Sequence, residues 1–132
     1  MTHRFKRSAE GEAIMVAVEL DGTHTFKMVL DTGASRTTFD TTALLMAGCD
    51  VQNRVTETDV IETANGIIKV GVFETDNLTA LGRTVGNLPV QVYDFLAHGV
   101  LSDYDGLLGL DFFENTILCI DFKNQTIEVK SA

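Results

Sequence analysis

Apolar residues recur at every second position in two neighbouring segments near the start of the chain. The alternation runs through residues 13–20 and again through residues 25–30. The apolar positions are Ile14, Val16, Val18, Leu20, Phe26, Met28 and Leu30. A period of two is typical of a β-strand with one buried face, and Asp21-Gly22 between the segments is a favoured two-residue hairpin turn. The pattern therefore predicts a β-hairpin whose second strand leads directly into Asp31.

Further strand and turn signals follow along the chain. Asn65-Gly66 is flanked by apolar residues and accepts the positive φ angles of a type I′ turn, so a second hairpin is expected there. Pro89 cannot donate a backbone hydrogen bond, which confines its strand to an edge or places proline among the first residues. Lys123-Asn124 is expected to connect a final hairpin. The expected strands are residues 78–81, 83–85, 88–92, 116–122 and 126–130.

Helical signals are few and short. Asp40 is expected to cap a short helix that Gly48 ends, with Leu44 and Leu45 facing the core. Residues 95–105 are expected to form a loop, and residues 111–114 a helical turn. Short strands at regular spacing with one or two small helices predict an all-β barrel or sandwich. We expect a single domain at residues 13–132, preceded by a flexible leader at residues 1–12.

The charge balance narrows the range of partners. The net charge is −9, with 19 acidic and 10 basic residues, and this disfavours binding to nucleic acid or to anionic membranes. The one basic cluster lies in the expected leader: His3, Arg4, Lys6 and Arg7. No apolar stretch reaches the length of a membrane span. We expect a soluble chain, either cytoplasmic or the soluble domain of a bacterial envelope protein, without membrane contact.

Metal and thiol chemistry find little support in the sequence. His3, His24 and His98 are scattered, with no Cys, Asp or Glu at ligand spacing, so neither a metal nor a cofactor is expected. Cys49 and Cys119 lie in apolar surroundings without metal-site spacing. Buried free thiols are the favoured interpretation and a disulfide is the alternative.

One motif carries specific chemistry. The segment Val29-Leu30-Asp31-Thr32-Gly33-Ala34-Ser35 has two apolar residues, then Asp-Thr-Gly, then a small residue, directly after a strongly alternating strand. It resembles the signature of the retropepsin-like aspartic proteases, in particular their bacterial type. The resemblance continues in family order, with Thr63-Ala64-Asn65-Gly66 at the position of the flap hairpin and Gly106-Leu107-Leu108-Gly109 at the second signature.

The resemblance implies a fold, an activity and a set of site residues. The fold would be a closed or partly open β-barrel of the acid-protease type, and the activity would be aspartic endopeptidase. Asp31 would be the catalytic carboxylate, Thr32 would hold two active-site loops together, Gly33 would allow a sharp turn, and Ser35 would donate a hydrogen bond to Asp31. The implied substrate-binding residues are Ala34, Thr63, Ala64, Asn65, Gly66, Ile67, Leu107, Leu108 and Gly109.

The motif occurs only once in the sequence, which has consequences for assembly. Peptide hydrolysis by this chemistry needs two carboxylates that share a proton. Asp21-Gly22 and Asp105-Gly106 lack the threonine, so a homodimer with one Asp31 from each copy is expected to act on a peptide or protein substrate. Two alternatives remain: a catalytically dormant module of the same fold that dimerises or binds peptides, and an unrelated β-barrel that binds a small ligand.

Overall fold

The computed structural model describes residues 1–50, 53–63, 66–100 and 103–131. Within these residues, strands form a ten-stranded sheet and a three-stranded sheet. The path of the large sheet is β6-β7-β10-β5-β11-β4-β3-β8-β9, with β2 paired to β3. Its strands are β2 (Lys6–Arg7), β3 (Ile14–Leu20), β4 (His24–Leu30), β5 (Thr38–Asp40), β6 (Val55–Thr63), β7 (Gly66–Glu74), β8 (Asn77–Ala80), β9 (Arg83–Gly86), β10 (Pro89–Tyr93) and β11 (Gly106–Leu108).

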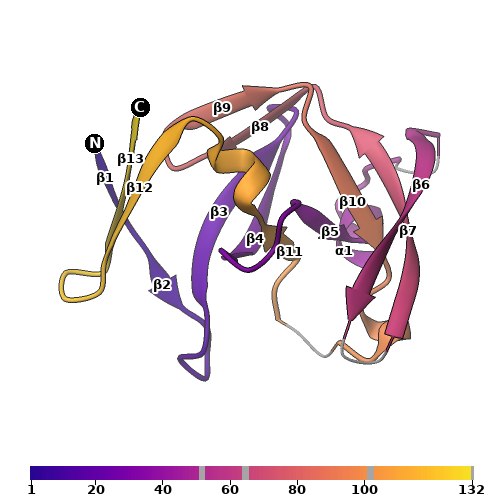
Figure 1. Cartoon of the computed structure of the whole chain (residues 1–132), viewed down its shortest axis with the longest axis horizontal. Helices are drawn as coiled ribbons and strands as arrows, with labels where there is room; N and C mark the ends of the chain where they lie inside the picture. Colours follow the sequence, from indigo (N-terminus) through magenta and orange to yellow (C-terminus); the bar gives the residue numbers. More distant parts are fainter. Residues whose placement is uncertain (51–52, 64–65, 101–102, 132) are drawn as a thin grey trace.

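The small sheet brings the two ends of the chain together. Its order is β1-β13-β12, from β1 (Thr2–Arg4), β12 (Thr116–Asp121) and β13 (Thr126–Ser131). Figure 1 shows this sheet at one end of the molecule and the β6–β7 hairpin at the other. The helices are α1 (Thr41–Met46) and the 3-10 helices η1 (Leu96–His98) and η2 (Leu110–Phe113). The predicted all-β class is confirmed. The large sheet is open, because β6 and β9, the strands at its two edges, do not pair with each other within the described residues.

The first predicted hairpin is present with the expected turn. Strands β3 and β4 pair in register from Met15↔Val29 to Leu20↔His24. Asp21 and Gly22 have φ angles of 54° and 72°, the positive values that a type I′ turn requires. The N–H of Thr23 closes the turn on the carbonyl of Leu20 at 3.1 Å. The alternating apolar side chains point into the core, where Val18 and Met28 are fully buried.

Aromatic side chains fill the centre of the fold. Phe39 is fully buried and contacts Phe26 edge-on with ring centroids 5.4 Å apart, while Phe73 packs at 6.4 Å on another side. These rings come from β5, β4 and β7, so one aromatic cluster joins three strands of the large sheet. Edge-to-face pairs of this kind stabilise a core beyond the area that they bury.

Most of the other predicted elements are present. Pro89 is the first residue of β10, as its missing donor requires, and η1 lies in the predicted loop at residues 95–105. The closing hairpin is β12–β13. In the second hairpin, Thr63 pairs with Gly66, so Gly66 belongs to β7 and not to a turn. Asn65 lies outside the described residues.

Besides Gly66, the structure differs from the sequence-based expectations at four places. Residues 2–7, expected within a flexible leader, form β1 and β2 and bury Phe5 between them. Leu45 is 56% exposed, because a helix of six residues has room to bury only Leu44. The carboxylate of Asp40 accepts the N–H of Phe95 and does not cap α1.

The fourth difference concerns the cysteines. Both are free thiols, as favoured over a disulfide, but Cys119 is exposed and Cys49 only partly buried. The expectation that both are buried is wrong. Burial alternates along β12, and Cys119 occupies one of its outward positions.

Candidate active site

Asp31 stands where two parallel strands of the large sheet end side by side. Strand β11 pairs with β4 in parallel register, Gly106↔Met28 and Leu108↔Leu30. The N–H of Asp31 continues this ladder by donating to the carbonyl of Leu108 at 3.0 Å. The two signatures found in the sequence, separated by about half the chain, are therefore direct neighbours in the fold.

The loop after β4 turns sharply around the Asp31 side chain. The N–H of Gly33 donates to Asp31 Oδ1 at 2.9 Å, and the N–H of Ala34 donates to the Asp31 carbonyl at 3.2 Å. A Cβ atom at position 33 would lie 3.2 Å from Asp31 Oδ1, so glycine lets the backbone approach the carboxylate. Thr32 and Ser35 are exposed. The carboxylate receives its hydrogen bond within the described chain from Gly33 and none from Ser35.

A second set of contacts fixes the far end of this loop. Thr37 is fully buried, and its N–H and hydroxyl both donate to Asp111, the hydroxyl at 2.7 Å. The Thr37 hydroxyl oxygen in turn accepts the N–H of Gly109 at 3.1 Å, and Ala34 accepts the N–H of Leu110 at 2.8 Å. Asp111 thereby ties η2 to the loop at residues 31–37, called the Asp31 loop below. Its carboxylate also accepts the buried Thr37 donors, which would otherwise lack partners.

The Asp31 loop forms one wall of a groove of about 410 Å³. The opposite wall is β6, which stands where the resemblance expects the flap, and β10 and β11 lie between the two. The groove is lined by Gly33, Ala34, Ser35, Arg36, Thr38, Asp59, Val60, Ile61, Glu62, Gln91, Tyr93 and Leu107. It is mixed in character, with apolar side chains beside charged ones.

A polar cluster links the two walls of the groove. Asp59 of β6 accepts a hydrogen bond from Gln91 Nε2 at 3.1 Å and forms an ion pair with Arg36 Nη1 at 3.7 Å. The backbone N–H of Val60 also donates to its carboxylate. These partners, the Val60 N–H first, lower the pKa of Asp59, so its carboxylate stays charged in the groove.

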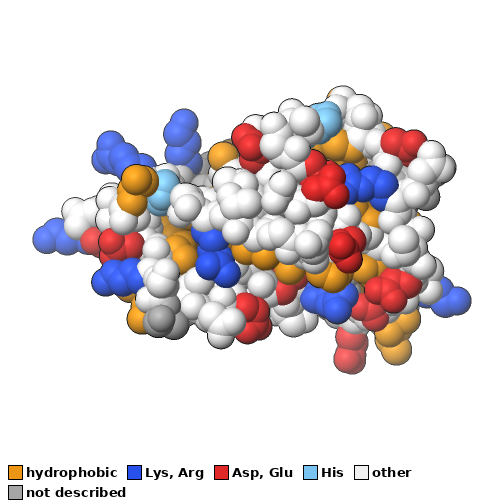
Figure 2. Space-filling view, turned by 90° about the horizontal axis from the view of Figure 1, so that it is seen from above, with side chains coloured by type: hydrophobic (Ala, Val, Ile, Leu, Met, Phe, Trp, Pro, Cys, Tyr) orange, Lys and Arg blue, Asp and Glu red, His pale blue; other side chains and the backbone are white. Residues whose placement is uncertain are grey.

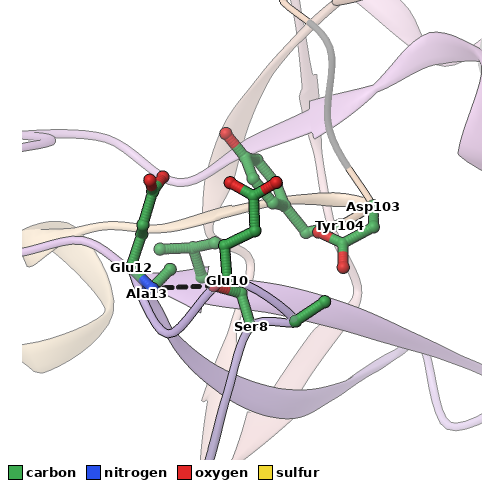
Figure 3. Close-up of a pocket in the computed structure, with 8 residues that line it drawn as sticks. Ser8, Glu10, Glu12, Ala13, Asp103 and Tyr104 are labelled. Carbon is green, nitrogen blue, oxygen red and sulfur yellow. Dashed lines mark hydrogen bonds between the residues drawn. The ribbon is translucent and has the colours of Figure 1, made fainter.

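A second hollow, of about 600 Å³, is lined by residues between β2 and β3, by β4 and by the segment before β11 (Figure 3). Glu10, Glu12 and Asp103 line it together with Tyr104 and with Val29, which lies two residues before Asp31. Burial raises the pKa of the Tyr104 hydroxyl, and the negative charges of Asp31 and Asp103 raise it further. The Tyr104 ring contacts Phe95, which stacks on Tyr93 of the groove. The Tyr104 hydroxyl therefore stays protonated near neutral pH.

The predicted site residues are only partly brought together. Asp31, Thr32, Gly33, Ala34 and Ser35 share one loop, and Ala34 and Leu107 line the groove with Gly33 and Ser35. Leu108 and Gly109 are buried behind it. On the flap, Gly66 and Ile67 begin β7, are exposed and do not line the groove. The Thr63 side chain, Ala64 and Asn65 lie outside the described residues.

Several groove residues were not foreseen from the sequence. They are Arg36, Thr38, Asp59, Val60, Ile61, Glu62, Gln91 and Tyr93. Arg36 directly follows the motif, and the position of residues 59–62 before the expected flap turn was the signal that could have identified the flap residues. Gln91 and Tyr93 offered no such signal, because nothing in the sequence indicates that β10 passes under the flap.

Two further properties bear on the class of site. The described residues contain no group of three or more His, Cys, Asp or Glu side chains arranged to hold a metal ion. In the same part of the chain, no helix has the length and apolar character needed to cross a membrane.

Comparison with known proteins agrees with this geometry. A family described as aspartyl protease matches residues 16–112. The crystal structure of a retropepsin-like aspartic protease from Rickettsia conorii is similar to the chain, with a TM-score of 0.70 and 22% sequence identity, covering 98% of this chain and 91% of that chain. No curated protein matches the sequence. The chain belongs to the aspartyl protease family, and its fold is of the retropepsin-like type.

Proposed function

We propose that the chain is an aspartic endopeptidase that works as a homodimer, with one Asp31 from each copy at a shared active site. The observation that carries the proposal is the position of Asp31. Its carboxylate is held by the Gly33 N–H on a loop that is pinned to β11 and forms a wall of the groove. The sequence supplies one Asp-Thr-Gly motif, so a second copy must supply the second carboxylate.

The reaction follows from two carboxylates placed close together. Like charges at short range do not both ionise, so the pair holds one proton between them, as is general for aspartic proteases. The ionised carboxylate takes a proton from a water molecule as the water oxygen bonds to the peptide carbonyl carbon, and the protonated carboxyl gives its proton to the carbonyl oxygen, which forms a diol. The diol collapses when the C–N bond breaks: the amide nitrogen takes a proton from one carboxyl of the pair, and one diol hydroxyl gives its proton to the other carboxylate as the new carbonyl forms. Neither a metal nor a cofactor takes part in these steps.

The groove accounts for how a substrate would be held. A peptide lying along β6 would pair with its backbone as an added strand and place alternate side chains towards the groove. Val60, Ile61 and Leu107 offer apolar contacts, and Arg36 and Glu62 offer charged ones. Thr32 is proposed to hold the two catalytic loops in register, and Ser35 to reach the Asp31 carboxylate once the second copy is in place.

The proposal is tested by the substitution Asp31→Asn. We expect the purified protein to cleave members of a peptide library, and the variant to lose activity by a factor of about 10³ or more, since its pair lacks the general base. Asp50→Asn is the matched control, because Asp50 is exposed and does not line the groove. A statine-type mimic of the diol should inhibit the wild type. Cleavage that persists in Asp31→Asn, with the same products, would overturn the assignment.

Mixing the subunits tests the shared site directly. If one Asp31 from each copy is needed, wild-type and Asp31→Asn chains mixed in equal amounts and allowed to exchange should show roughly a quarter of the activity of the same total of wild type. Chains that act alone would give roughly half. A result near half would refute the dimeric site while leaving Asp31 catalytic, so the two parts of the proposal can fail separately.

A further inference from the structure

The outer edge of β3 contains a gap away from the active-site groove. Strand β2 pairs with this edge at Ile14 and Met15, and β8 pairs with it at Glu19 and Leu20. No described strand pairs with residues 16–18 on that edge. Arg4 stands at one end of the gap, two residues before β2 begins. Leu81 stands at the other end, directly after β8, and its φ angle of 53° turns the chain away from the strand direction.

The backbone of Ala17 points into this gap. Its partner on β4 is Lys27, whose N–H donates to Asp105 Oδ2 at 2.8 Å and whose carbonyl accepts the Asp105 N–H at 2.7 Å. Both groups of Lys27 are thus engaged on the side away from β3. In an antiparallel ladder, directly opposed residues either bond to each other or both point outwards. The N–H and carbonyl of Ala17 therefore face the gap and offer one donor and one acceptor to an incoming strand.

The surroundings of the gap are positively charged. A groove of about 460 Å³ lies over it, with Met15 and Ala17 as apolar lining and Arg4, Lys6, Lys27 and His3 around them. No carboxylate lines the groove, and none of the ion pairs within the described chain involves Arg4, Lys6 or Lys27. Figure 2 shows several Lys and Arg side chains with a few acidic ones at the end of the molecule where β1, β12 and β13 lie, and mostly acidic side chains with some Lys and Arg over the rest of this face.

We propose that this β3-edge groove, formed around Ala17 by Arg4, Lys6, Met15 and Lys27, docks an extended acidic segment of a partner protein. The segment would add a short strand to β3 through Ala17 and place its carboxylates against the three cations. Charge complementarity selects the occupant. The net charge of −9 would repel a long polyanion such as nucleic acid, or an anionic membrane, from the rest of the surface, whereas a short acidic segment needs only the groove.

The site is independent of the proposed catalysis. It lies on the β3 edge, and none of its residues lines the active-site groove. Binding should therefore be equal in the wild type and in Asp31→Asn, and the variant also prevents cleavage of the probe. A failure of docking would leave the proteolytic proposal untouched, and the reverse also holds.

The test is fluorescence anisotropy with a labelled synthetic peptide of alternating Glu and Val, added to the full chain. We expect saturable binding that is lost when Lys replaces Glu in the peptide. A third peptide, N-methylated at alternate backbone positions, keeps the charges and prevents strand pairing. It should bind about tenfold more weakly than the parent peptide. Equal binding of the N-methylated and parent peptides, or no binding of the parent peptide, would overturn the proposal.

Paired charge reversals locate the binding surface. Lys6→Glu with Lys27→Glu should weaken binding at least about tenfold, while Lys69→Glu with Lys123→Glu makes the same change in net charge outside the groove and should weaken it less than about twofold. All four lysines are exposed, so both variants should fold, which circular dichroism checks. Equal weakening by the two variants would show diffuse attraction and refute the site. A change of oligomeric state in the groove variant alone would assign the groove to a second copy and also refute it.

Discussion

The two walls of the active-site groove are attached to the rest of the molecule in different ways. The Asp31 loop is pinned at both ends by Leu108, Leu110 and Asp111, and the buried N–H and hydroxyl of Thr37 both donate to Asp111. The flap hairpin β6–β7 projects from the fold and leaves Val60 58% and Ile67 73% exposed. The Asp31 loop is thus the more constrained wall and the β6–β7 hairpin the less constrained one. Under the proposed function, the first would position a carboxylate and the second would admit a peptide.

The flap itself is anchored unevenly. At its root, Arg54 donates to Asp21 at 2.6 Å and to the Glu74 carbonyl at 3.0 Å, and it stacks over the Phe73 ring. Farther along, Asp59 contacts Arg36 of the Asp31 loop and Gln91 of β10, and β7 pairs with β10 from Gly71 to Glu74. The hairpin is therefore held most firmly near its root, and Val60 and Ile67 beyond it are exposed. Four changes test this contrast.

Gly109→Ala should produce the largest effect of the four, because the added methyl group would press on the backbone of the Asp31 loop. A Cβ atom there would lie 2.6 Å from the Arg36 carbonyl carbon and 2.8 Å from the Ala34 oxygen. Since all of these are backbone atoms, the loop must move, and we expect a loss of about 3 kcal/mol in the free energy of unfolding. Urea unfolding measures it. Gly86→Ala is the control, since its nearest atom is 3.7 Å away, and a comparable loss there would contradict the explanation.

Asp111→Ala should lower the free energy of unfolding by a smaller amount than Gly109→Ala. It leaves the buried N–H and hydroxyl of Thr37 without their acceptor, at a cost of about 2 kcal/mol in unfolding free energy and with a fall in kcat if the loop shifts. Asp111→Asn retains one acceptor oxygen and should lose about half as much. If the two variants prove equally stable, the hydrogen bonds to Thr37 do not brace the loop.

Asp21→Asn tests the root of the flap and adds a dependence on pH. Burial alone would raise the pKa of Asp21, but the hydrogen bond from Arg54 and the N–H groups of Asn77 and Asp76 outweigh it and lower the pKa. A carboxyl whose pKa is lower in the folded state contributes stability above its unfolded pKa, and the contribution is lost as pH falls through the folded value. The variant should therefore be less stable by about 1 kcal/mol near neutral pH.

The measurement is urea unfolding of both proteins across a series of pH values. The difference between wild type and Asp21→Asn should shrink as pH falls below about 4, the ordinary pKa of an aspartate, and should vanish only once the folded carboxyl, whose pKa is lower, is protonated as well. A difference that stays constant with pH would show that the ion pair with Arg54 contributes no net stability.

Ile67→Ser should have the smallest effect on folding. Ile67 is exposed on β7, so its truncation should change the unfolding free energy by less than about 0.5 kcal/mol. If the flap closes on peptide, the same change should raise KM more than it lowers kcat. Ile68→Ser, at the partly buried neighbour on the other face, is the control that should cost more stability. If Ile67→Ser is more destabilising than Ile68→Ser, the exposed face of the β6–β7 hairpin contributes to folding and the contrast with the Asp31 loop fails.

The sequence predicted the parts of the fold that local patterns specify. The β3–β4 hairpin followed from strict alternation and from Asp21-Gly22, whose backbone angles only a few residues tolerate. The position of the Asp31 loop directly after β4 followed from the alternating strand and the contiguous motif behind it. Leu45 was assigned wrongly because a single turn of helix carries too little periodicity to show which side is buried.

Contacts between distant segments were out of reach. Asp111 was expected only as part of a helical turn, yet it holds Thr37, which is 74 positions away. The Asp59 cluster depends on β6 curling over the groove to reach Gln91, and hydrophobic periodicity contains no information on such curvature. The pairing of β1 with β13 was likewise missed, because a strand of three residues leaves no pattern to detect.

The parallel pairing of β4 with β11 also has a consequence for the order of events in folding. Lys27 and Asp105 are 78 positions apart, and strands joined across such long stretches of chain pair slowly because loop closure must come first. The hairpins β3–β4 and β6–β7 need only local contacts. During synthesis, the Asp31 loop cannot take its final conformation until residues 106–111 have emerged, because Leu108, Leu110 and Asp111 supply the contacts that hold it.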